Sequence, residues 1–376
     1  MTGSEQDGAF MRRALELGRR GLGRTSPNPA VGAVVVRAGK VVGEGFHRRA
    51  GGPHAEVEAL RRAGTKARGA TLYCTLEPCS HQGRTPPCAP AVAAAGIARV
   101  VVGTIDPNPR VRGRGMRLLR RGGVETTIGT EEESCRELLR FFAHHQRHGR
   151  PFVRLKLAAS LDGRIAAAGG SARWITGPAA RALVHRWRDE MDAVLVGSGT
   201  ALADDPALTC RRRGGRDPLR IVLDGRLRLP PTARLLREGD SPVWVVTGTG
   251  YDRRRAARLE RAGARVVAVA RRRGRLDVGA LLDRLGEDGV LSLLVEGGGE
   301  VAAGLLSGGH VDEICLFSAP ILLGGDGFAM VGSLGVRDPG RAPRLRVVRR
   351  EAVGADLLTV ARPAGRAPRR SLQGGR

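Results

Sequence analysis

Short apolar runs of strand length alternate with amphipathic segments of helical spacing along nearly the whole chain. This alternation constrains the fold, because strands connected by helices pair in a largely parallel sheet that the helices then cover. The pattern occurs twice, so we predict two α/β domains over residues 1–148 and 149–363. The last residues, 364–376, are rich in Arg, Gly and Pro without apolar periodicity, and we expect a disordered basic tail there.

The first domain carries clear signals for individual elements. Two apolar runs around Ala38-Gly39 predict a hairpin within residues 30–47, and a helix is expected from His54 to Arg62. A polar stretch with three histidines, residues 143–151, follows the last helix of this domain. It lacks acidic or thiol neighbours, so an interdomain linker is the better interpretation and a metal site the weaker one.

A formal net charge of +26 raises the hypothesis of a nucleic-acid partner. Three features weaken it. The charges are dispersed along the chain, aromatic residues make up only 3% of it, and nearly all the basic residues are arginine, with lysine at Lys40, Lys66 and Lys156 alone. That imbalance, together with abundant Gly and Ala, indicates a coding bias rather than a binding surface.

The sequence begins without a charged and then apolar leader, and its apolar runs are too short to cross a bilayer. We therefore expect a cytoplasmic protein with no membrane partner. Six cysteines spread over 376 residues do not resemble a disulfide framework, so metal or thiol chemistry is the favoured use of this residue type.

The sharpest chemical motif is His54-Ala55-Glu56 at the start of the expected helix, followed later by Pro78-Cys79 and then Cys88. Zinc deaminases use this type of signature: one histidine and two thiolates hold the metal, the fourth position stays open, and a nearby glutamate that is not a ligand moves protons. Eight residues separate the two cysteines, more than in the usual C-x-x-C spacing. A helix expected to begin directly after Cys88 would favour its thiolate through the helix dipole.

Other interpretations of these residues remain open at this point. His54 can be an ordinary surface histidine beside two core cysteines. Cys74, inside the strand expected over 70–76, competes as a ligand but is typical of a buried thiol, and His81 in the loop can bind metal or substrate. Gln82 and Arg84 are further loop residues that can face a substrate.

In the second domain a glycine cluster, residues 297–299, lies between an expected strand and an expected helix. Backbone amides at such a helix N-terminus bind phosphate groups. Gly297, Gly299 and Ala302 also match the loose dinucleotide pattern G-x-G-x-x-G/A, but too little chain follows for a complete Rossmann domain. A plain tight turn is the alternative.

Four segments of the first domain, TSPNPAVGAVVV, AGGPHAEVEAL, TLEPCSHQGRTPPC and DPNPRVRGRG, occur in an order that resembles one family. These are the bifunctional riboflavin-biosynthesis enzymes, in which a pyrimidine deaminase is fused to a reductase. The long spacing between the cysteines is that family's variant of the deaminase signature. The resemblance implies a cytidine-deaminase-like fold, zinc held by His54, Cys79 and Cys88, Glu56 as the proton shuttle and Asn28 at the substrate.

The segments LKLAASLDGR, WITGPAARALVHRWR, AVLVGSGTALADDPALT and LVEGGGEVAAGLL resemble the reductase half of the same family. The resemblance implies a fold similar to dihydrofolate reductase and NADPH as the cofactor. The residues it places at the cofactor are Ala158, Trp174, Thr200, Asp204, Gly225 and the loop of Gly298, Gly299, Glu300, Val301, Ala302, Ala303 and Gly304. Those it places at the ribosyl-phosphate substrate are Ala172, Arg188, Leu208, Arg211 and Glu296.

Two of these positions depart from the family's pattern. Ala172 and Gly225 stand where relatives can have serine, at a substrate contact and at a cofactor contact respectively. Both therefore lack a side-chain hydroxyl, which leaves the main chain to make the contact. For the proton needed in the reduction, Asp204 is the side chain that the sequence offers.

The leading hypothesis is an enzyme of riboflavin biosynthesis that deaminates a diaminopyrimidinone ribosyl phosphate at zinc and then reduces its ribosyl group with NADPH. The alternative is a zinc-dependent nucleic-acid base deaminase with an accessory domain. A zinc-stabilised interaction module without catalysis is the third possibility, and it leaves Glu56 without a role. We expect a small-molecule substrate, a homo-oligomer and no nucleic-acid partner.

Overall fold

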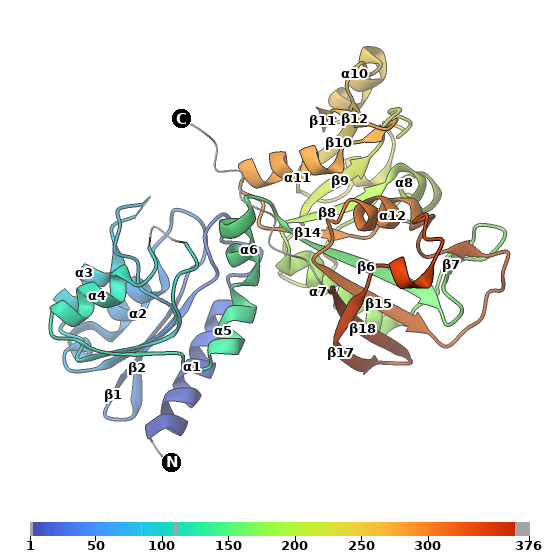
Figure 1. Ribbon diagram of the computed structural model, residues 1–376. Coiled ribbons are helices and arrows are strands. Elements are labelled where there is room, and N and C mark those ends of the chain that lie inside the picture. The colour runs from blue at the N-terminus through green and yellow to red at the C-terminus, as the bar shows by residue number, and fades with distance from the viewer. Residues whose placement is uncertain (1–2, 84, 109–110, 365–376) are drawn as a thin grey trace. The chain divides into compact units, whose positions relative to one another are not determined.

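A computed structural model describes residues 3–83, 85–108 and 111–364, and Figure 1 shows their helices and strands. The chain divides by its internal contacts into two units, Met1–Gly149 and Arg150–Arg376. Of the predicted tail, Ala364 is described, and the remaining residues lie outside the described part of the chain. Among the described helices, none has the length and apolar character needed to cross a membrane.

The first unit is built on a five-stranded sheet with strand order β2-β1-β3-β4-β5. β1 is antiparallel to both β2 and β3, whereas β3, β4 and β5 are parallel. Two apolar cores form because α1 and α5 cover one face of the sheet and α2, α3 and α4 cover the other (Figure 1). The strands are β1 (Gly32–Arg37), β2 (Lys40–Phe46), β3 (Thr71–Leu76), β4 (Arg99–Thr104) and β5 (Glu125–Ile128). The helices are α1 (Gly3–Arg19), α2 (Ala55–Ala63), α3 (Cys88–Ala94), α4 (Arg114–Arg121), α5 (Glu132–Leu138) and α6 (Arg140–His148), with a 3-10 turn η1 (Gly64–Ala67).

Residues 143–148 of the stretch predicted to be a linker lie in α6, so the prediction is wrong for them, whereas the two units divide just after the helix, between Gly149 and Arg150. Phe141 and Phe142 are buried and give the start of this helix a packed face. No glycine or proline interrupts α6 before Gly149, which ends the helix with a positive φ of 66°. The polar end of α6 is therefore the continuation of a helix, half-buried over residues 143–146, which a composition-based interpretation mistakes for a connector.

The second unit is built on a nine-stranded sheet with strand order β11-β10-β9-β8-β14-β6-β15-β18-β17. Its first seven strands are parallel, β18 is antiparallel to β15, and β17 is antiparallel to β18. α11 and α12 pack on one face. On the other face Trp187 of α7 stacks against Phe317 of β15, with ring centroids 5.5 Å apart. The predicted α/β class is thus confirmed, while the hairpin of β17 and β18 is an element that the sequence pattern missed.

The bounds of this unit's main strands are β6 (Phe152–Ser160), β8 (Ala193–Gly197), β9 (Leu219–Leu223), β10 (Val243–Gly248), β11 (Ala264–Val269), β14 (Ser292–Val295), β15 (Glu313–Ala319), β17 (Leu345–Val353) and β18 (Asp356–Pro363). Its helices are α7 (Pro178–Glu190), α8 (Ser198–Asp204), α9 (Arg234–Arg237), α10 (Arg253–Arg261), α11 (Val278–Glu287) and α12 (Gly299–Ser307), with a short turn η2 (Pro339–Arg341). Short two-stranded ribbons join β7 (Arg164–Ala166) with β16 (Phe328–Ala329) and β12 (Arg271–Arg272) with β13 (Arg275–Leu276).

Two glycines of β2 bring α2 unusually close to the sheet. A Cβ on Gly43 would lie 2.2 Å from the carbonyl oxygen of Ala59, and one on Gly45 would lie 2.3 Å from that of Ala55. Both of these oxygens belong to the backbone of α2 and cannot move aside by themselves, so a side chain at either glycine would force α2 away from β2. Because α2 follows His54 and carries Glu56, this close packing sets where the predicted metal site can form.

We predict that Gly45→Ala displaces α2 and lowers its local stability by about 1–3 kcal/mol, the usual cost of overpacking a tight contact. Hydrogen exchange measured by mass spectrometry should then show faster exchange in peptides of α2. Gly122→Ala is the matched control, since its Cβ would meet the nearest atom at 3.4 Å, an ordinary contact. Exchange of α2 that stays as slow as in the unchanged protein would contradict the packing argument.

Candidate functional site

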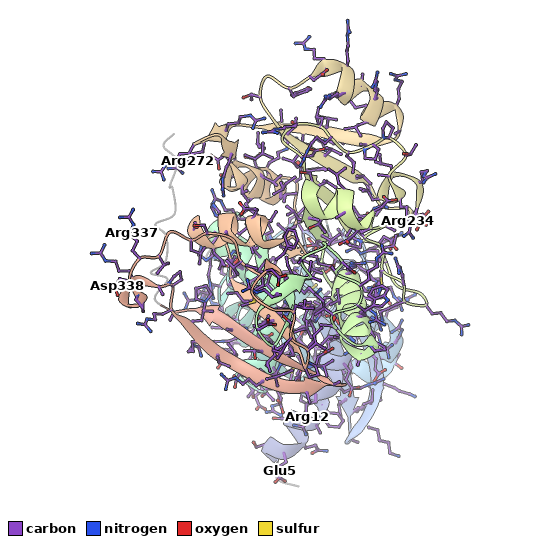
Figure 2. All side chains as sticks on the ribbon, turned by 90° about the vertical axis from the view of Figure 1, so that its right-hand side faces the viewer. Glu5, Arg12, Arg234, Arg272, Arg337 and Asp338 are labelled. Atoms are coloured by element: carbon purple, nitrogen blue, oxygen red, sulfur yellow. The ribbon has the colours of Figure 1, made fainter. Side chains whose placement is uncertain are left out.

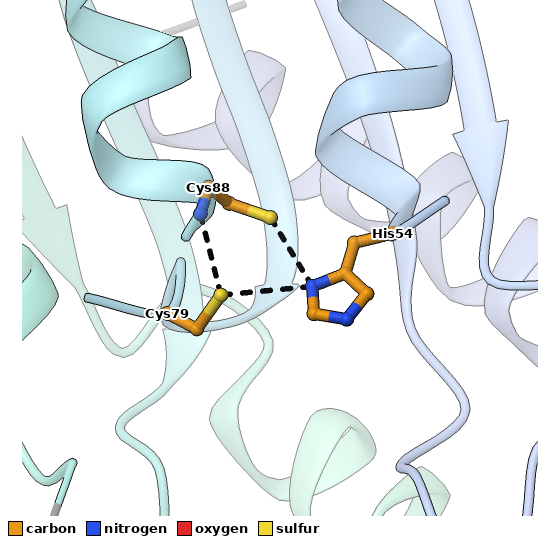
Figure 3. Close-up of side chains that lie close together, drawn as sticks. All are labelled: His54, Cys79 and Cys88. Atoms are coloured by element: carbon orange, nitrogen blue, oxygen red, sulfur yellow. Dashed lines mark hydrogen bonds between the residues drawn. The ribbon is translucent and has the colours of Figure 1, made fainter. Parts of the chain in front are cut away.

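The three predicted metal ligands meet at the carboxyl end of β3. His54 immediately precedes α2, Cys79 follows β3, and Cys88 is the first residue of α3. Figure 3 shows the three side chains pointing toward one another from these different elements. Within the described residues, these three form the one group of His, Cys, Asp and Glu side chains close enough to hold a metal ion.

The donor set and its spacing fit zinc. His54 Nδ1 lies 3.2 Å from Cys88 Sγ and 3.6 Å from Cys79 Sγ, and the ligand atoms all fall within 4.8 Å of one another. Tetrahedral zinc with its usual bond lengths separates a nitrogen and a sulfur ligand by about 3.5 Å. One imidazole and two thiols are also a donor set that zinc prefers to harder cations. The residues therefore fit a zinc ion with one position left for another ligand.

Thr85 supports His54 from the other side of the ring, a contact that sequence reasoning missed. Its Oγ1 lies 3.1 Å from His54 Nε2, so Nδ1 is left to face the two cysteines. Outer partners of this kind fix the orientation and tautomer of a ligating histidine. His81 and Gln82 in the same loop are exposed, and Arg84 lies outside the described residues.

The N-terminus of α3 acts mainly on Cys79. The backbone N–H of Cys88 donates to Cys79 Sγ over 3.3 Å, so the first amide of the helix stabilises that thiolate. Hydrogen bonding between the two cysteines lowers the pKa of Cys79 and raises that of Cys88. The sequence predicted that the N-terminus of this helix stabilises the Cys88 thiolate, but in the structure its first amide stabilises the Cys79 thiolate instead. Cys74, the competing ligand, is fully buried inside β3, and burial raises the pKa of its thiol.

Glu56 lies in the first turn of α2 with only 4% of its surface exposed. Burial is the main cause that raises the pKa of its carboxyl group to about 7. Because a carboxyl group with a pKa near neutrality can both accept and release a proton, the environment of Glu56 suits proton transfer. None of the three ligand atoms belongs to Glu56, so its carboxylate is not one of the metal ligands.

Asn28 is tied to the metal site through His47, which the sequence did not single out. The Asn28 side-chain nitrogen lies 3.1 Å from His47 Nε2, and His47 Nδ1 lies 3.0 Å from the carbonyl oxygen of Pro53. The rings of His47 and His54 meet edge to face at 5.2 Å. Burial lowers the pKa of His47, so its neutral form is favoured. Asn28 is therefore linked to the predicted ligand His54 through a single intervening side chain, that of His47.

Glu77, two residues before Cys79, is a second residue that sequence reasoning missed. Its buried carboxylate accepts hydrogen bonds from the backbone amides of Asp106, Gly113 and Gly115, at 3.2, 2.8 and 2.9 Å. It thereby holds the segment after β4 and caps the start of α4. Burial raises the pKa of Asp106 to about 6, and charge on Cys79 adds to this effect. The sequence did offer a signal for Glu77, because it is an acidic residue only two positions before the predicted ligand Cys79.

The second candidate site lies at the carboxyl ends of the parallel strands of the nine-stranded sheet. Arg188 of α7 and Glu296, which follows β14, are paired by two hydrogen bonds of 2.6 and 2.9 Å. Arg188 also donates to the carbonyl oxygen of Thr209 over 2.9 Å. Although burial acts against it, the charge of Arg188 lowers the pKa of Glu296. Both residues were predicted to bind substrate, and in the structure they bind each other.

Lys156 of β6 belongs to the same group and was not selected from the sequence. Burial lowers the pKa of its ammonium group, and the charge of Glu296 partly offsets this. The signal was present, because Lys156 is one of three lysines in the chain and lies in the apolar stretch of β6 over residues 155–159. A charged residue inside a buried strand is expensive unless it is paired or functional.

The glycines before α12 have different roles. A Cβ on Gly297 would lie 2.8 Å from the side chain of Val301, and one on Gly299 would lie 2.7 Å from the carbonyl oxygen of Ala329. Packing alone explains these two glycines. Gly298 instead faces the hydroxyl of Thr200, with 3.4 Å between that oxygen and a Cβ at this position. The open part of the helix N-terminus is therefore at Gly298, where backbone amides can meet a phosphate.

The other predicted residues of the second domain are divided between the core and the surface. Thr200 and Asp204 lie on α8, and Arg173 donates to the carbonyl oxygen of Asp204, which ties the exposed Trp174 loop to α8. Leu208 is buried with a left-handed φ of 57°, an uncommon conformation for leucine. Ala302 and Ala303 are buried, Ala158, Ala172, Gly225, Val301 and Gly304 are partly exposed, and Arg211 and Glu300 are exposed.

Comparison with known proteins identifies both domains. Residues 4–104 match the cytidine and deoxycytidylate deaminase zinc-binding region, and residues 151–359 match the RibD C-terminal domain. The riboflavin biosynthesis protein RibD of Escherichia coli is 42% identical to this chain, with 94% of this chain and 98% of that protein covered. The chain belongs to the RibD family.

Other RibD proteins agree with this assignment over almost their full length. RibD of Bacillus amyloliquefaciens is 41% identical, with 94% of this chain and 95% of that protein covered. The solved RibD of Acinetobacter baumannii superposes with a TM-score of 0.84 at 39% identity, covering 96% of this chain and 100% of that one. A deaminase/reductase of Thermotoga maritima gives the same TM-score and identity, covering 96% and 99%. The predicted family, fold and two-activity enzyme are confirmed, including a zinc-binding deaminase domain and a reductase domain.

The buried Arg188–Glu296 pair gives a prediction for stability in this RibD chain. Glu296→Gln leaves the Arg188 charge buried without its partner, so we expect the free energy of unfolding of the second domain to fall by about 3 kcal/mol. Denaturation followed by tryptophan fluorescence measures this, because all three tryptophans lie in that domain. Asp283→Asn, which breaks the exposed pair with Arg150, is the control and should cost less than about 1 kcal/mol. Equal effects of the two changes would refute the assignment.

Proposed function

We propose that this protein catalyses two successive reactions of riboflavin biosynthesis. The first is hydrolytic deamination of the diaminopyrimidinone ribosyl phosphate, and the second is NADPH-dependent reduction of its ribosyl group to a ribityl chain. The observation that carries the proposal is the presence on one chain of a histidine and two cysteines beside the buried Glu56 and of a RibD C-terminal domain.

In the first domain His54, Cys79 and Cys88 would hold the zinc. Zinc, when bound there, lowers the pKa of water and so supplies a hydroxide nucleophile at neutral pH. Glu56 would take up the proton released from water and deliver it to the ring nitrogen as hydroxide adds to the amine-bearing carbon. It would then take the proton of the added hydroxyl group and pass it to the amine, so that ammonia leaves and the carbonyl bond forms. Asn28, held by His47, would orient the pyrimidine, and Thr85 keeps the His54 ring in place.

In the second domain the cofactor would lie along the carboxyl ends of β8, β9 and β14. NADPH, when bound there, supplies the hydride for the sugar carbon attached to the amino nitrogen. The amides at Gly298 and the hydroxyl of Thr200 would hold its phosphates. The other residues proposed to contact this cofactor and the substrate are those that the family resemblance places there in the sequence analysis.

The proton for this reduction can come from two side chains. Asp204 is the one that the sequence offered, and Lys156 is the one that the structure adds. Burial lowers the pKa of Lys156 and so makes its proton easier to donate. The adjacent Glu296 and Arg188 would position the substrate, with Arg211 at the exposed end for its phosphate.

A nucleic-acid base deaminase explains the basic charge and the zinc site, but it leaves the matched reductase domain without a function. We therefore keep a small-molecule substrate as part of the proposal, without a nucleic-acid partner. A cytoplasmic location and a homo-oligomeric state are also proposed, as expected from the sequence and from the family.

We expect Glu56→Gln to abolish ammonia release while the protein keeps about one zinc per chain, because Glu56 moves protons without ligating the metal. His54→Ala should instead deplete the zinc, since a ligand is lost. Metal analysis together with an ammonia assay separates the two variants. Near-normal turnover of Glu56→Gln would remove Glu56 from the mechanism.

Purified protein mixed with the diaminopyrimidinone ribosyl phosphate tests the whole function. Without NADPH, the protein should release ammonia, and when NADPH is added it should be oxidised in the amount of substrate already deaminated. In the Glu56→Gln variant, NADPH oxidation should depend on supplying the deaminated compound. Zinc-loaded protein that releases no ammonia from this substrate would refute the proposed first reaction.

A further inference from the structure

Arg271 lies across the carboxyl ends of two neighbouring strands of the second domain. Gly225 follows β9, Gly248 is the last residue of β10, and Arg271 begins β12 shortly after β11. The Arg271 guanidinium donates from Nη2 to the carbonyl oxygen of Gly225 over 2.6 Å. The side chain is thus directed back onto the sheet edge although the residue is exposed.

Glycine at position 248 makes room for this guanidinium. A Cβ there would lie 2.3 Å from Arg271 Nε and 2.7 Å from Cζ, closer than atoms can approach. A Cβ on Gly225 would lie 3.5 Å from Arg271 Nη1, an ordinary contact. Neither glycine has a positive φ. The backbone therefore does not require glycine at these positions, and a side chain at Gly248 would displace the Arg271 guanidinium from the place that it occupies.

The guanidinium keeps most of its hydrogen-bonding capacity for another partner. Arginine has five N–H donors, and the hydrogen bond to Gly225 uses one of them. In the described part of the chain, no carboxylate forms an ion pair with Arg271. Two further exposed arginines lie on the loop after β9: the carbonyl oxygen of Arg226 accepts from Arg255 over 3.0 Å, and Arg228 donates to Ser198 over 2.8 Å. Asp252 pairs with Arg255, and Asp224, which follows β9, is buried and accepts from the amide of Leu229. Among the described residues at this edge, Arg271 and Arg228 are therefore charged side chains that no carboxylate pairs with.

This arginine lies on the same sheet edge as the proposed cofactor site. β14, β8, β9 and β10 are neighbouring parallel strands, so their carboxyl ends line up. β9 lies two strands from β14, or about 10 Å at the usual strand spacing. A dinucleotide with its pyrophosphate at Gly298 can therefore place its adenosine half near Gly225 and Arg271.

We propose that Arg271 binds the 2′-phosphate of NADPH and makes the reductase site select NADPH over NADH. This inference rests on the proposed reductase function and names the residue that reads the phosphate. A planar guanidinium binds phosphate through two parallel hydrogen bonds, and an arginine near the ribose is a common means of accommodating a 2′-phosphate. Gly225 lacks the hydroxyl that relatives can have there, and the Arg271 guanidinium lies in contact distance of that position, 3.5 Å from where a Cβ would be.

The test is direct binding of NADPH and of NADH to the full-length protein, measured by isothermal titration calorimetry without substrate. Arg271→Gln should weaken NADPH binding about tenfold, the effect of losing a hydrogen bond to a charged group, and change NADH binding less than about twofold. Arg272→Gln is the matched control. It removes the same charge from the next residue, whose side chain points to the other side of the strand and projects outward from the hairpin (Figure 2).

Arg271→Lys guards against a folding defect in the glutamine variant. It keeps the charge but loses the planar fork, so we expect NADPH binding between those of the unchanged protein and Arg271→Gln. Unchanged tryptophan fluorescence and unfolding temperature verify that each variant is folded. Loss of NADPH preference in Arg271→Gln, with the preference retained in Arg272→Gln, supports the proposal.

The other outcomes overturn it in distinguishable ways. If the unchanged protein prefers NADPH and Arg271→Gln keeps that preference, the phosphate is read elsewhere and the proposed function stands. Equal binding of NADPH and NADH by the unchanged protein also overturns the role of Arg271. Binding of neither dinucleotide, with deamination intact, overturns the reductase half of the proposed function and this inference with it.

Discussion

Parallel strands end at the same edge of a sheet, and both candidate sites depend on this constraint. In the first domain, the end of β3 brings Cys79 to the N-termini of α2 and α3, where His54 and Cys88 lie. In the second domain, the ends of β8 and β14 bring Thr200 and Glu296 to one edge. Helices that return to the start of the next strand leave their N-terminal amides at this edge, so anions and polar ligands find donors there.

Buried charge is the second feature that the two sites share. Glu56 and Glu77 in the first domain, and Glu296 and Lys156 in the second, are held in places with little access to water. Each buried charge is expensive by itself, so it must be satisfied by backbone amides, by an opposite charge or by a ligand. Glu77 is satisfied by three backbone amides and Glu296 by Arg188. For Glu56, burial outweighs the charge of His54 and the hydrogen bonds to its own amide and to Cys88, so the pKa of its carboxyl group is raised to about 7, which is consistent with a group that exchanges protons.

Glycines separate into those that packing requires and those that leave room for a ligand. Gly43 and Gly45 allow α2 to approach the sheet, and Gly297 and Gly299 allow α12 to approach its neighbours. Gly298 faces Thr200 across an open contact, and Gly248 accommodates the guanidinium of Arg271. The sequence presents all of these as the same residue, and their roles differ only in what a Cβ would meet.

The sequence by itself determined the α/β class, the metal ligands to test and the family, because strand and helix periodicities and short motifs are local properties of the chain. It missed His47, Glu77, Thr85 and Lys156. Three of these, Glu77, Thr85 and Lys156, lie inside the segments that carry the family resemblance, but the contacts that give them a role join them to residues elsewhere in the fold. It also mistook the end of α6 for a linker, because a polar helix end has the composition of a loop. Only the tertiary structure decided that Arg188 and Glu296 pair and that Arg271 reaches the ends of β9 and β10. These contacts join segments on different strands and helices, and sequence spacing carries no information about such distances.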